Sequence, residues 1–395
     1  MKLIWITPEC PYPPNSGGRN VVWNRIVELS KNNEIFLYSL IENEKDYEYI
    51  PELQKVCKTV SFYKRKKNVG VCIKSFFSPF VVVSRTIDKM KKDIEMKCNE
   101  ITPDFIIVDF PQMLCNIEKS LFKKYKVILC QHNIEFLTLK NISKGIKNPI
   151  KKIAYRLISL QMKMFENKQY KNNKFSLITF VSIDDKKCFE KKYNNINTYL
   201  FPIGANITEK ISFDGNDIAF VAKMSYLPNE QAAIWFIENV WEKVYKENKG
   251  CKFYIVGKEP SNNLINIAKK YENIIITGKV DSVDEYYKKA KIIIIPLFSG
   301  GGVKVKLLEA LGKGKLVITT SKGIEGTNFE KDRHVIVCDT ADEFISECNN
   351  VMNSFEKYKR IIECSHQKMY DEFSWRYIVN LFERKLIEMV NKNEE

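Results

Sequence analysis

The sequence predicts an α/β protein with two doubly wound domains, each a parallel sheet covered by helices on both faces. The chain of 395 residues has the length of two ordinary domains. Short apolar segments rich in β-branched residues alternate with amphipathic helical segments along the whole chain, a pattern typical of buried parallel strands. This alternation is interrupted once, near residues 201–216, where turn residues show neither period. The interruption predicts the boundary between the two domains.

Each domain is expected to contain six strands. In the first half they are 2–7, 34–40, 59–63, 104–109, 126–130 and 176–181. In the second half they are 217–222, 252–256, 273–277, 291–297, 315–319 and 334–338. Residues 373–390 have apolar positions at helical spacing and no strand after them, so we expect a helix that docks on a surface already formed. Ligands of such sheets bind beyond the carboxyl ends of the strands, so two facing domains would enclose a cleft.

The composition excludes several classes of protein. Hydrophobic residues make up 45% of the chain, which is enough for a buried core and excludes a disordered protein. No apolar run reaches the roughly 18 residues of a membrane-spanning helix, and the run before Pro8 is too short for a signal peptide. Eleven cysteines occur without CxxC pairs or regular spacing. They indicate reduced thiols in a cytoplasmic protein, with neither disulfides nor a metal site.

Basic residues are concentrated in the first half of the chain. Residues 1–200 contain 35 Lys and Arg against 20 Asp and Glu, whereas residues 201–395 contain 28 of both kinds. Either a lysine-rich composition or a basic face that meets anionic lipid or a polyanion explains the excess. No motif indicates nucleic acid. The segment 63–92 alternates basic clusters with aromatic residues, and it is either an ordinary helix pair or a surface that contacts a membrane.

Three consecutive glycines, Gly300 to Gly302, separate a predicted strand from a helical segment. Glycine destabilises a helix by about 1 kcal/mol relative to alanine, so three together require a reason. A strand, a glycine turn and a helix N-terminus form an anion site, because unpaired N–H groups point outward and no Cβ blocks an oxygen. Lys304 and Lys306 add cations suited to phosphate, and Glu309 follows one turn later. The segment indicates a nucleoside-diphosphate cradle with a ribose-binding carboxylate; the alternative is a glycine-rich connection beside a solvated Lys–Glu pair.

The stretch GGGVKVKLLEA (300–310) is similar to the donor-binding signature of a subgroup of retaining GT-B glycosyltransferases of the group 1, or family 4, superfamily. Glu309 is the second acidic position of that signature, and Gly301 stands where many members have a first glutamate. Other segments resemble the family's motifs in the expected order, so the chain is identified as a member over nearly its full length. These segments are PYPPNSGGRNVVWNRI (11–26), QHNIEF (131–136), FVSIDD (180–185), FVAKMSYLPNEQAAIWF (220–236), YIVGKEP (254–260), ITGKVDSVDEYY (276–287) and the terminal helix that begins FSW.

The resemblance implies the GT-B architecture, in which two Rossmann-like domains face a central cleft. An N-terminal acceptor-binding domain would span residues 1–205 and be completed by the C-terminal helix 373–392, which crosses back to it. A nucleotide-sugar donor-binding domain would span residues 206–372. The resemblance also implies a retaining, metal-independent, hexosyltransferase-like enzyme that needs no cofactor and takes a UDP- or GDP-sugar as its donor.

Individual roles follow from the same resemblance. His132 would lie beside the reacting sugar, and Lys223 would bind the donor phosphate. Lys304 and Lys306 would stabilise the charge of the leaving diphosphate. The remaining donor-binding residues are Gly17, Gly18, Val280, Gly301, Gly302, Val303 and Glu309.

Arg19 and Asp109 are the predicted acceptor-binding residues. Arg19 lies in the first turn of a predicted helix, where the dipole disfavours a cation unless it binds an anion or is solvated. Asp109 ends a predicted strand, where an acidic residue is either functional or the cap of the next helix.

The sequence thus predicts transfer of a sugar, with retention, to a hydroxyl of a saccharide, lipid-linked or protein-linked acceptor. The expected context is bacterial surface polysaccharide or glycoconjugate synthesis, in the cytoplasm or peripherally on the inner face of the cytoplasmic membrane. An anionic membrane surface is a further expected partner, and nucleic acid is not. Two alternatives stay open. One is a GT-B partner subunit that has lost activity, suggested by Gly301, and the other is a nucleotide-sugar epimerase of the same architecture.

Overall fold

The chain forms two compact units, which we describe separately. The first comprises residues 1–203 and the residues from 375 onward, and the second comprises residues 204–374. The computed structural model describes residues 1–66, 70, 74–75, 78–146 and 148–391. Lys67, part of the predicted segment 63–92, and the last residue of the predicted helix 373–392 lie outside the described residues.

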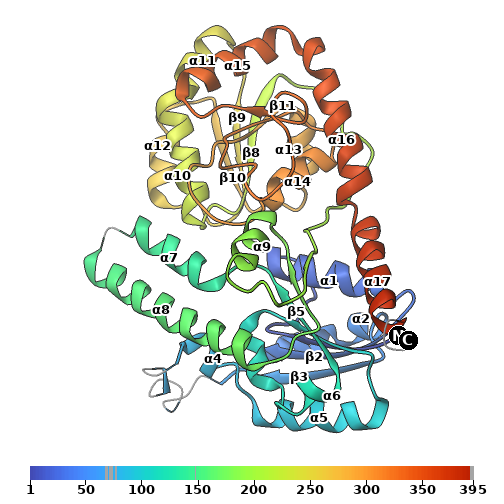
Figure 1. Ribbon diagram of the computed structural model, residues 1–395. Coiled ribbons are helices and arrows are strands. Elements are labelled where there is room, and N and C mark those ends of the chain that lie inside the picture. The colour runs from blue at the N-terminus through green and yellow to red at the C-terminus, as the bar shows by residue number, and fades with distance from the viewer. Residues whose placement is uncertain (67–69, 71–73, 76–77, 147, 392–395) are drawn as a thin grey trace. The chain divides into compact units, whose positions relative to one another are not determined.

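The sheet of the first unit has seven parallel strands in the order β3-β2-β1-β4-β5-β6-β7 (Figure 1). At its centre, Ile4 of β1 pairs with Phe36 of β2 and Ile106 of β4. Ile4 packs into one hydrophobic cluster and the adjacent Trp5 into another, so both faces of the sheet are buried, as expected for parallel strands. The strands are β1 (Lys2–Thr7), β2 (Glu34–Ile41), β3 (Thr59–Lys64), β4 (Phe105–Asp109), β5 (Lys126–Gln131), β6 (Leu177–Phe180) and β7 (Thr198–Leu200).

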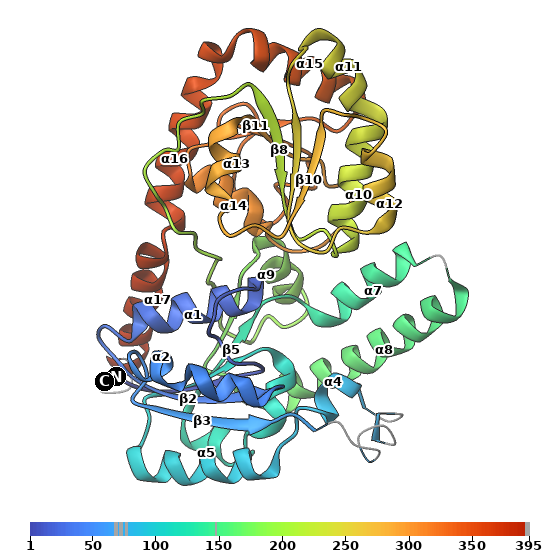
Figure 2. The ribbon, with the colours of Figure 1, turned by 180° about the vertical axis from the view of Figure 1, so that it is seen from behind.

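Helices cover both faces of this sheet (Figures 1 and 2). The helical segments of the first unit are α1 (Gly17–Leu29), η1 (Glu44–Tyr49), α2 (Ile50–Gln54), α4 (Phe80–Val83), α5 (Asp88–Ile101), η2 (Pro111–Asn116), α6 (Leu121–Lys124), α7 (Glu135–Gly145), α8 (Pro149–Asn172), α9 (Ile183–Glu190) and α17 (Trp375–Asn391). Helices α7 and α8 lie side by side and extend beyond the sheet in both views. None of the helices in the described part of the chain has the length and apolar character needed to cross a membrane.

The C-terminal helix α17 packs on the N-terminal sheet, which confirms the predicted return of the chain. Ile378 and Phe382 belong to the same buried cluster as Trp5. The ring of Phe382 stacks on that of Phe201 with 4.1 Å between centroids, and the guanidinium of Arg25, itself fully buried, lies 3.7 Å from the Phe201 ring centre. The sequence pattern identified this face because its apolar residues recur at helical spacing.

The second unit has a six-stranded parallel sheet in the order β10-β9-β8-β11-β12-β13 (Figure 1). Its strands are β8 (Asp217–Val221), β9 (Phe253–Val256), β10 (Ile274–Gly278), β11 (Ala290–Ile295), β12 (Val317–Thr319) and β13 (Ile336–Val337). Its helical segments are α10 (Leu227–Phe236), η3 (Ile237–Trp241), α11 (Glu242–Glu247), α12 (Asn262–Ala268), α13 (Asp284–Lys289), α14 (Val305–Gly312), α15 (Ala341–Asn353), η4 (Phe355–Tyr358) and α16 (Lys359–Phe373).

The predicted strands all have counterparts, and β7 is the strand that the sequence analysis missed. It has only three residues, Thr198–Leu200, all half-buried, and pairs at the edge of the sheet with β6. So short a segment with little burial carries neither a continuous apolar run nor an alternation, the two patterns by which strands are recognised.

Candidate functional site

The glycine turn connects β11 to α14 at the carboxyl edge of the second sheet. Gly300 has φ +102° and Gly302 has φ +68°, backbone conformations that residues with a Cβ rarely adopt. A Cβ on Gly300 would lie 3.4 Å from the Tyr226 hydroxyl, whereas a Cβ on Gly301 would meet nothing within 4 Å. Among the described residues no backbone acceptor faces the N–H groups of Gly301 to Val303. The turn therefore presents free donors with little steric cover.

Two lysines, Lys304 and Lys306, follow this turn. The carboxylates of Glu325 and Glu309 act on their pKa values, but none of the described residues lies within ion-pair distance of either lysine. Lys304 is the N-cap residue of α14 and is 6% exposed, and its Nζ donates to the carbonyl of Gly302. Burial lowers the pKa of Lys304 to about 8, and burial, together with the charge of Lys304, lowers the pKa of Lys306 to about 8. Within the described part of the chain neither ammonium group forms an ion pair. A buried cation without a counterion destabilises the fold, so the site is prepared for an anion.

Glu309 lies one turn after Lys306 on α14. Its side chain is half-buried, and burial raises the pKa of its carboxyl group. Tyr287 is fully buried, and its hydroxyl has no hydrogen-bond partner among the described residues. It is near enough to Glu309 that the charge of this carboxylate raises the pKa of Tyr287 further. The charges of Lys313 and Lys306 act on the pKa of Glu309 in the direction opposite to burial, so this carboxylate lies near both of these lysines.

The loop after β8 lies next to the glycine turn. In the sheet, β8 lies between β9 and β11, so the strand order reverses between β8 and β11. This position is a topological switch point, where ligands of such sheets usually bind. Tyr226 of this loop contacts Gly300, and Asn229 Nδ2 donates to the Lys223 carbonyl at 2.7 Å. The chain order therefore brings Lys223 to the same edge as the glycine turn.

Lys223 and Val280 belong to neighbouring loops of this edge. A Cβ on Gly257 would overlap the carbonyl of Ala222, and the N–H of Gly257 donates to the carbonyl of Gly278 at 3.2 Å. The loops after β8, β9 and β10 are thus in contact, and Val280 lies two residues beyond Gly278. Lys223 is exposed, and its Nζ lies 3.6 Å from Glu259, a residue to which the sequence analysis gave no role.

In the first unit, His132 and Asp109 form a pair at the carboxyl edge of the sheet. Asp109 ends β4 and is fully buried. It accepts a hydrogen bond from Trp5 Nε1 and bonds His132 Nε2 at 2.9 Å. Its burial places it behind the imidazole, so Asp109 orients His132 and has no surface for the acceptor contact predicted from the sequence. It does not cap a helix either.

The imidazole of His132 is held from a second direction by Phe110. The two rings stack with 4.1 Å between centroids. Burial lowers the pKa of His132, so the ring is neutral near pH 7. Donation from Nε2 to Asp109 leaves Nδ1 as an acceptor in the neutral ring. The histidine predicted to be catalytic is therefore fixed in orientation and able to accept a hydrogen bond.

Gly17, Gly18 and Arg19 begin α1 beside this pair. A Cβ on Gly18 would lie 3.6 Å from Glu9 Oε1 and 3.9 Å from Phe110 Cζ, whereas Gly17 faces open space. Arg19 Nε lies 2.8 Å from Glu9 Oε2. Glu9 was missed in the sequence, although an unexplained cation in a first helical turn is a signal to look for a nearby acid. The carboxylate of Glu9 explains how the positive charge of Arg19 is tolerated in the first turn of α1.

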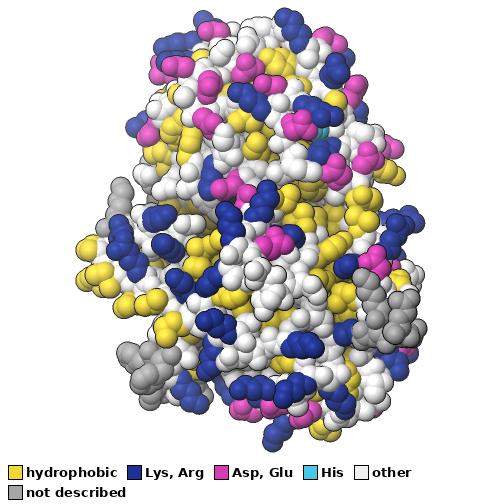
Figure 3. Space-filling view, in the orientation of Figure 1, with side chains coloured by type: hydrophobic (Ala, Val, Ile, Leu, Met, Phe, Trp, Pro, Cys, Tyr) yellow, Lys and Arg dark blue, Asp and Glu magenta, His cyan; other side chains and the backbone are white. Residues whose placement is uncertain are grey.

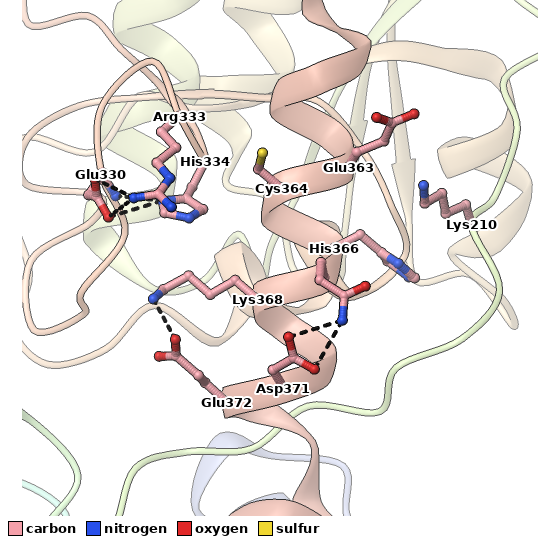
Figure 4. Close-up of a pocket in the computed structure, with 11 residues that line it drawn as sticks. Lys210, Glu330, Arg333, His334, Glu363, Cys364, His366, Lys368, Asp371 and Glu372 are labelled. Carbon is pink, nitrogen blue, oxygen red and sulfur yellow. Dashed lines mark hydrogen bonds and ion pairs between the residues drawn. The ribbon is translucent and has the colours of Figure 1, made fainter.

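A depression on the second unit is a separate feature (Figure 4). It has a volume of about 790 Å³ and is lined from α16 and residues 330–334. Its side chains pair with one another: Arg333 with Glu330 at 3.1 Å, and Lys368 with Glu372 at 2.8 Å. None of its lining residues belongs to the glycine turn. It contains no glycine turn, so the free N–H groups that favour a diphosphate at the start of α14 have no counterpart among these lining residues.

The described residues contain no group of three His, Cys, Asp or Glu side chains arranged to hold a metal ion. The groups able to hold a substrate are therefore the cations, glycine amides and carboxylate around α14, and the His132 cluster of the first unit.

Comparison with known proteins relates the second unit to a described family. Residues 215–354, within the second unit, match the family model described as "Glycosyl transferases group 1". Over 371 residues, covering 91% of this chain and 93% of the relative, the chain is 25% identical to an uncharacterized 44.6 kDa protein in the cps region of Klebsiella pneumoniae.

Solved structures with the same architecture cover almost the whole chain. Sucrose-phosphate synthase from Thermosynechococcus elongatus has a TM-score of 0.68 at 10% identity, with 99% of this chain and 100% of that chain covered. Anabaena HepE in complex with UDP and glucose has a TM-score of 0.67 at 11% identity, with 98% and 100% covered. The predicted fold, two parallel α/β units of the GT-B type, is confirmed.

Proposed function

We propose that the protein is a glycosyltransferase that moves a sugar from a nucleotide-sugar donor to a hydroxyl group of an acceptor. One observation carries the proposal. Two unpaired lysines, Lys304 and Lys306, flank a glycine turn with free N–H groups at the switch point of the second sheet. A diphosphate supplies the negative charge that these groups lack. The match of residues 215–354 to group 1 glycosyl transferases supports the same reading.

The proposed donor is a UDP- or GDP-sugar. The diphosphate would accept hydrogen bonds from the amides of Gly301 to Val303 and receive the charges of the two lysines. Glu309 would accept hydrogen bonds from the ribose hydroxyls, and the loop at Val280 would hold the base through its backbone. The UDP and glucose bound to HepE, a protein of the same fold, favour a uridine nucleotide as the first donor to test.

The proposed reaction retains the configuration at the transferred carbon and requires no metal. The bond between the anomeric carbon and the diphosphate oxygen breaks, and the acceptor oxygen bonds to the same face of the sugar. The acceptor proton passes to an oxygen of the leaving diphosphate. Lys223, Lys304 and Lys306 stabilise the charge that develops on that diphosphate. His132, held by Asp109 and Phe110, would accept a hydrogen bond from a hydroxyl of the donor sugar.

The proposed role is in bacterial surface polysaccharide or glycoconjugate synthesis, on a saccharide, lipid-linked or protein-linked acceptor. The location of the Klebsiella relative in a cps region favours this context. The excess of basic residues in the first half of the chain favours work at the inner face of the cytoplasmic membrane.

One observation favours a second candidate, a partner subunit that binds the nucleotide without catalysing transfer. Gly301 is exposed and offers no side chain at the position where many relatives of the predicted family have a glutamate. The unpaired lysines and the oriented histidine are retained, which weighs toward the enzyme.

The deciding experiment combines ligand binding with product analysis. UDP-, GDP- and ADP-sugars are first screened for thermal stabilisation of the full-length protein. The best donor is then incubated with saccharide and lipid-linked acceptors, and the anomeric configuration of the product is read by NMR. Stabilisation with a retained configuration supports the proposal, and an inverted product refutes the retaining mechanism. Stabilisation without transfer to any acceptor identifies the partner subunit, and no stabilisation by any nucleotide refutes both candidates.

A further inference from the structure

Helix α8 has two apolar faces, only one of which the fold uses. The inner face packs toward the sheet: Met162 is fully buried, and Tyr170 belongs to the core cluster. The outer face carries Ile150, Ile153, Leu157, Leu160 and Met164, with exposed fractions between 54% and 78%. We call these five residues the outer stripe. A surface helix of a globular protein normally has a polar outer face, so the outer stripe needs a separate explanation.

The spacing of the outer stripe shows that it is one continuous surface. Successive members are three, four, three and four residues apart, and side chains with that spacing lie on one side of a helix. The neighbouring helix α7 also has an exposed apolar residue, Ile142, which is 42% exposed. Figure 3 shows hydrophobic and basic side chains gathered over α7 and α8, at the left, with no acidic side chain among them in that view.

The charge around the outer stripe is of one sign. Residues 135–172 contain nine Lys and Arg and two Glu. Glu166 is fully buried and accepts hydrogen bonds from the N–H groups of Glu135 and Phe136, and the side chain of Glu135 is itself half-buried. Neither acid therefore offsets the basic residues on the surface. Among the described residues, Lys151, Lys152 and Arg156 have no ion-pair partner.

The basic cluster predicted from the sequence at 63–92 differs in this respect. Lys64 pairs with Glu44 at 3.2 Å, Arg65 with Glu42 at 2.7 Å and Lys66 with Asp88 at 3.3 Å. These three charges are already matched by acids of the same unit, and Lys67 lies outside the described residues. Unpaired basic residues and a row of exposed apolar side chains therefore occur together on α8.

We propose that the outer stripe of α8 docks the protein on an anionic lipid surface, with its apolar side chains among the acyl chains and Lys151, Lys152 and Arg156 at the headgroups. A helix that lies in a membrane interface needs this combination of an apolar face and flanking cations. A second copy of the chain fits less well, because pairing two stripes would bring two unmatched sets of basic residues together. The proposal goes beyond sugar transfer, and its test does not depend on turnover.

The experiment measures partition of the full-length protein onto vesicles of phosphatidylcholine, with and without phosphatidylglycerol. We expect at least about tenfold tighter binding to the anionic vesicles, lost at 1 M salt because the screening length falls to about 3 Å. The variant Ile153→Ser, Leu157→Ser, Leu160→Ser should bind at least about tenfold more weakly. A matched control removes three exposed apolar side chains elsewhere in the same unit and should bind like the parent. This control is Met96→Ser, Leu381→Ser, Ile387→Ser.

Charge variants test the second half of the proposal. Lys151→Gln, Lys152→Gln, Arg156→Gln should weaken binding about a hundredfold, since each basic residue near an anionic surface contributes about 1 kcal/mol. The control Lys92→Gln, Lys119→Gln, Lys123→Gln removes the same charge from exposed lysines outside the two helices and should have a much smaller effect.

Several outcomes would overturn the proposal. Equal binding of the parent to neutral and anionic vesicles would overturn it. Equal losses of vesicle affinity in the outer-stripe variant and in its control would also overturn it. A parent that is dimeric by sedimentation, does not bind vesicles and becomes monomeric in the outer-stripe variant would identify a second copy as the occupant. Melting curves and nucleotide binding of each variant show whether the fold is intact. A parent protein that binds anionic vesicles as expected but transfers no sugar would refute only the proposed function.

Discussion

The substitution Lys304→Met should make the protein more stable and remove much of its affinity for nucleotide. Lys304 is almost completely buried, and its pKa falls from the ordinary value of 10.5 to about 8. That difference corresponds to about 3 kcal/mol at neutral pH, since one pKa unit equals about 1.4 kcal/mol. Loss of the hydrogen bond to Gly302 offsets about 1 kcal/mol. The expected net gain is about 2 kcal/mol, or about 4–8 °C for a unit of this size.

The pH dependence of this gain identifies its cause. Below pH 8 the lysine is charged in both the folded and the unfolded protein, so the full penalty is present. Between pH 8 and 10.5 the unfolded chain still binds the proton that the folded protein has released, so parental stability rises with pH. Above pH 10.5 both forms are neutral. The stability difference between the variant and the parent should therefore be constant below pH 8 and shrink as the pH rises to 10.5.

A matched control separates stability from binding. Lys315 is also almost completely buried with a pKa lowered to about 8, and its Nζ donates to the Ile211 carbonyl at 3.4 Å. It precedes the amino end of β12, whereas the glycine turn follows the carboxyl end of the parallel strand β11. Lys315→Met should raise stability in the same way and leave nucleotide binding unchanged.

Calorimetry with the nucleoside diphosphate of the best donor completes the test. Loss of a charge-assisted contact of 1.5–3 kcal/mol predicts affinity about 10- to 150-fold weaker for Lys304→Met. Parental affinity in that variant, or equal losses in both variants, would refute the placement of the diphosphate at the glycine turn. A variant less stable than the parent at pH 7 would refute the argument from burial.

Three further predictions address the carboxylates and the glycine of the site. Glu309→Gln should weaken binding of the nucleoside diphosphate about 10- to 150-fold with no loss of melting temperature, and unchanged affinity by calorimetry would exclude the ribose contact. In Asp109→Asn the side-chain NH₂ group would face Trp5 or His132, where a carboxylate oxygen now accepts a hydrogen bond, so kcat should fall at least about tenfold with little change in KM. A kcat equal to that of the parent would show that the orientation of His132 does not matter. Gly301→Glu should leave stability within about 1 kcal/mol, because its Cβ meets nothing and its φ is ordinary, and should change the ratio of kcat/KM between donor sugars. A loss of several kcal/mol would mean that the turn cannot accept a side chain.

The fold could be predicted almost completely because the sequence repeats one simple pattern. Buried parallel strands have continuous apolar runs, such as residues 127–130 of β5 and 292–295 of β11, and the segments between them show helical spacing. The edge strand β7 was not predicted, because a strand at the edge of a sheet does not require apolar residues. The start of α14 at Val305 could not be fixed either, since helix boundaries depend on the conformation of the cap residue.

The candidate site could be predicted where chemistry is local and not where it depends on pairing. The glycine turn, its lysines and Glu309 are contiguous in the chain, so their residue types alone indicate an anion site. The fold brings Glu9 next to Arg19 and Glu259 next to Lys223. No spacing in the sequence predicts these two pairs. The same is true of Asp109, whose burial behind His132 changes its role from contact to orientation.

The outer stripe of α8 is a local pattern that the sequence contains but does not explain. The structure is needed to show which of its apolar residues are exposed. In the sequence, residues 149–172 have apolar positions on two sides of the helix, and nothing distinguishes a helix buried on all sides from one with a second exposed face. The structure separates the two sides, because Met162 is fully buried while Leu160 is 54% exposed. It also shows that Lys64, Arg65 and Lys66 of the basic segment singled out in the sequence pair with acids of their own unit. Both observations move the expected membrane contact from residues 63–92 to α8, a shift that composition and charge counts could not have indicated.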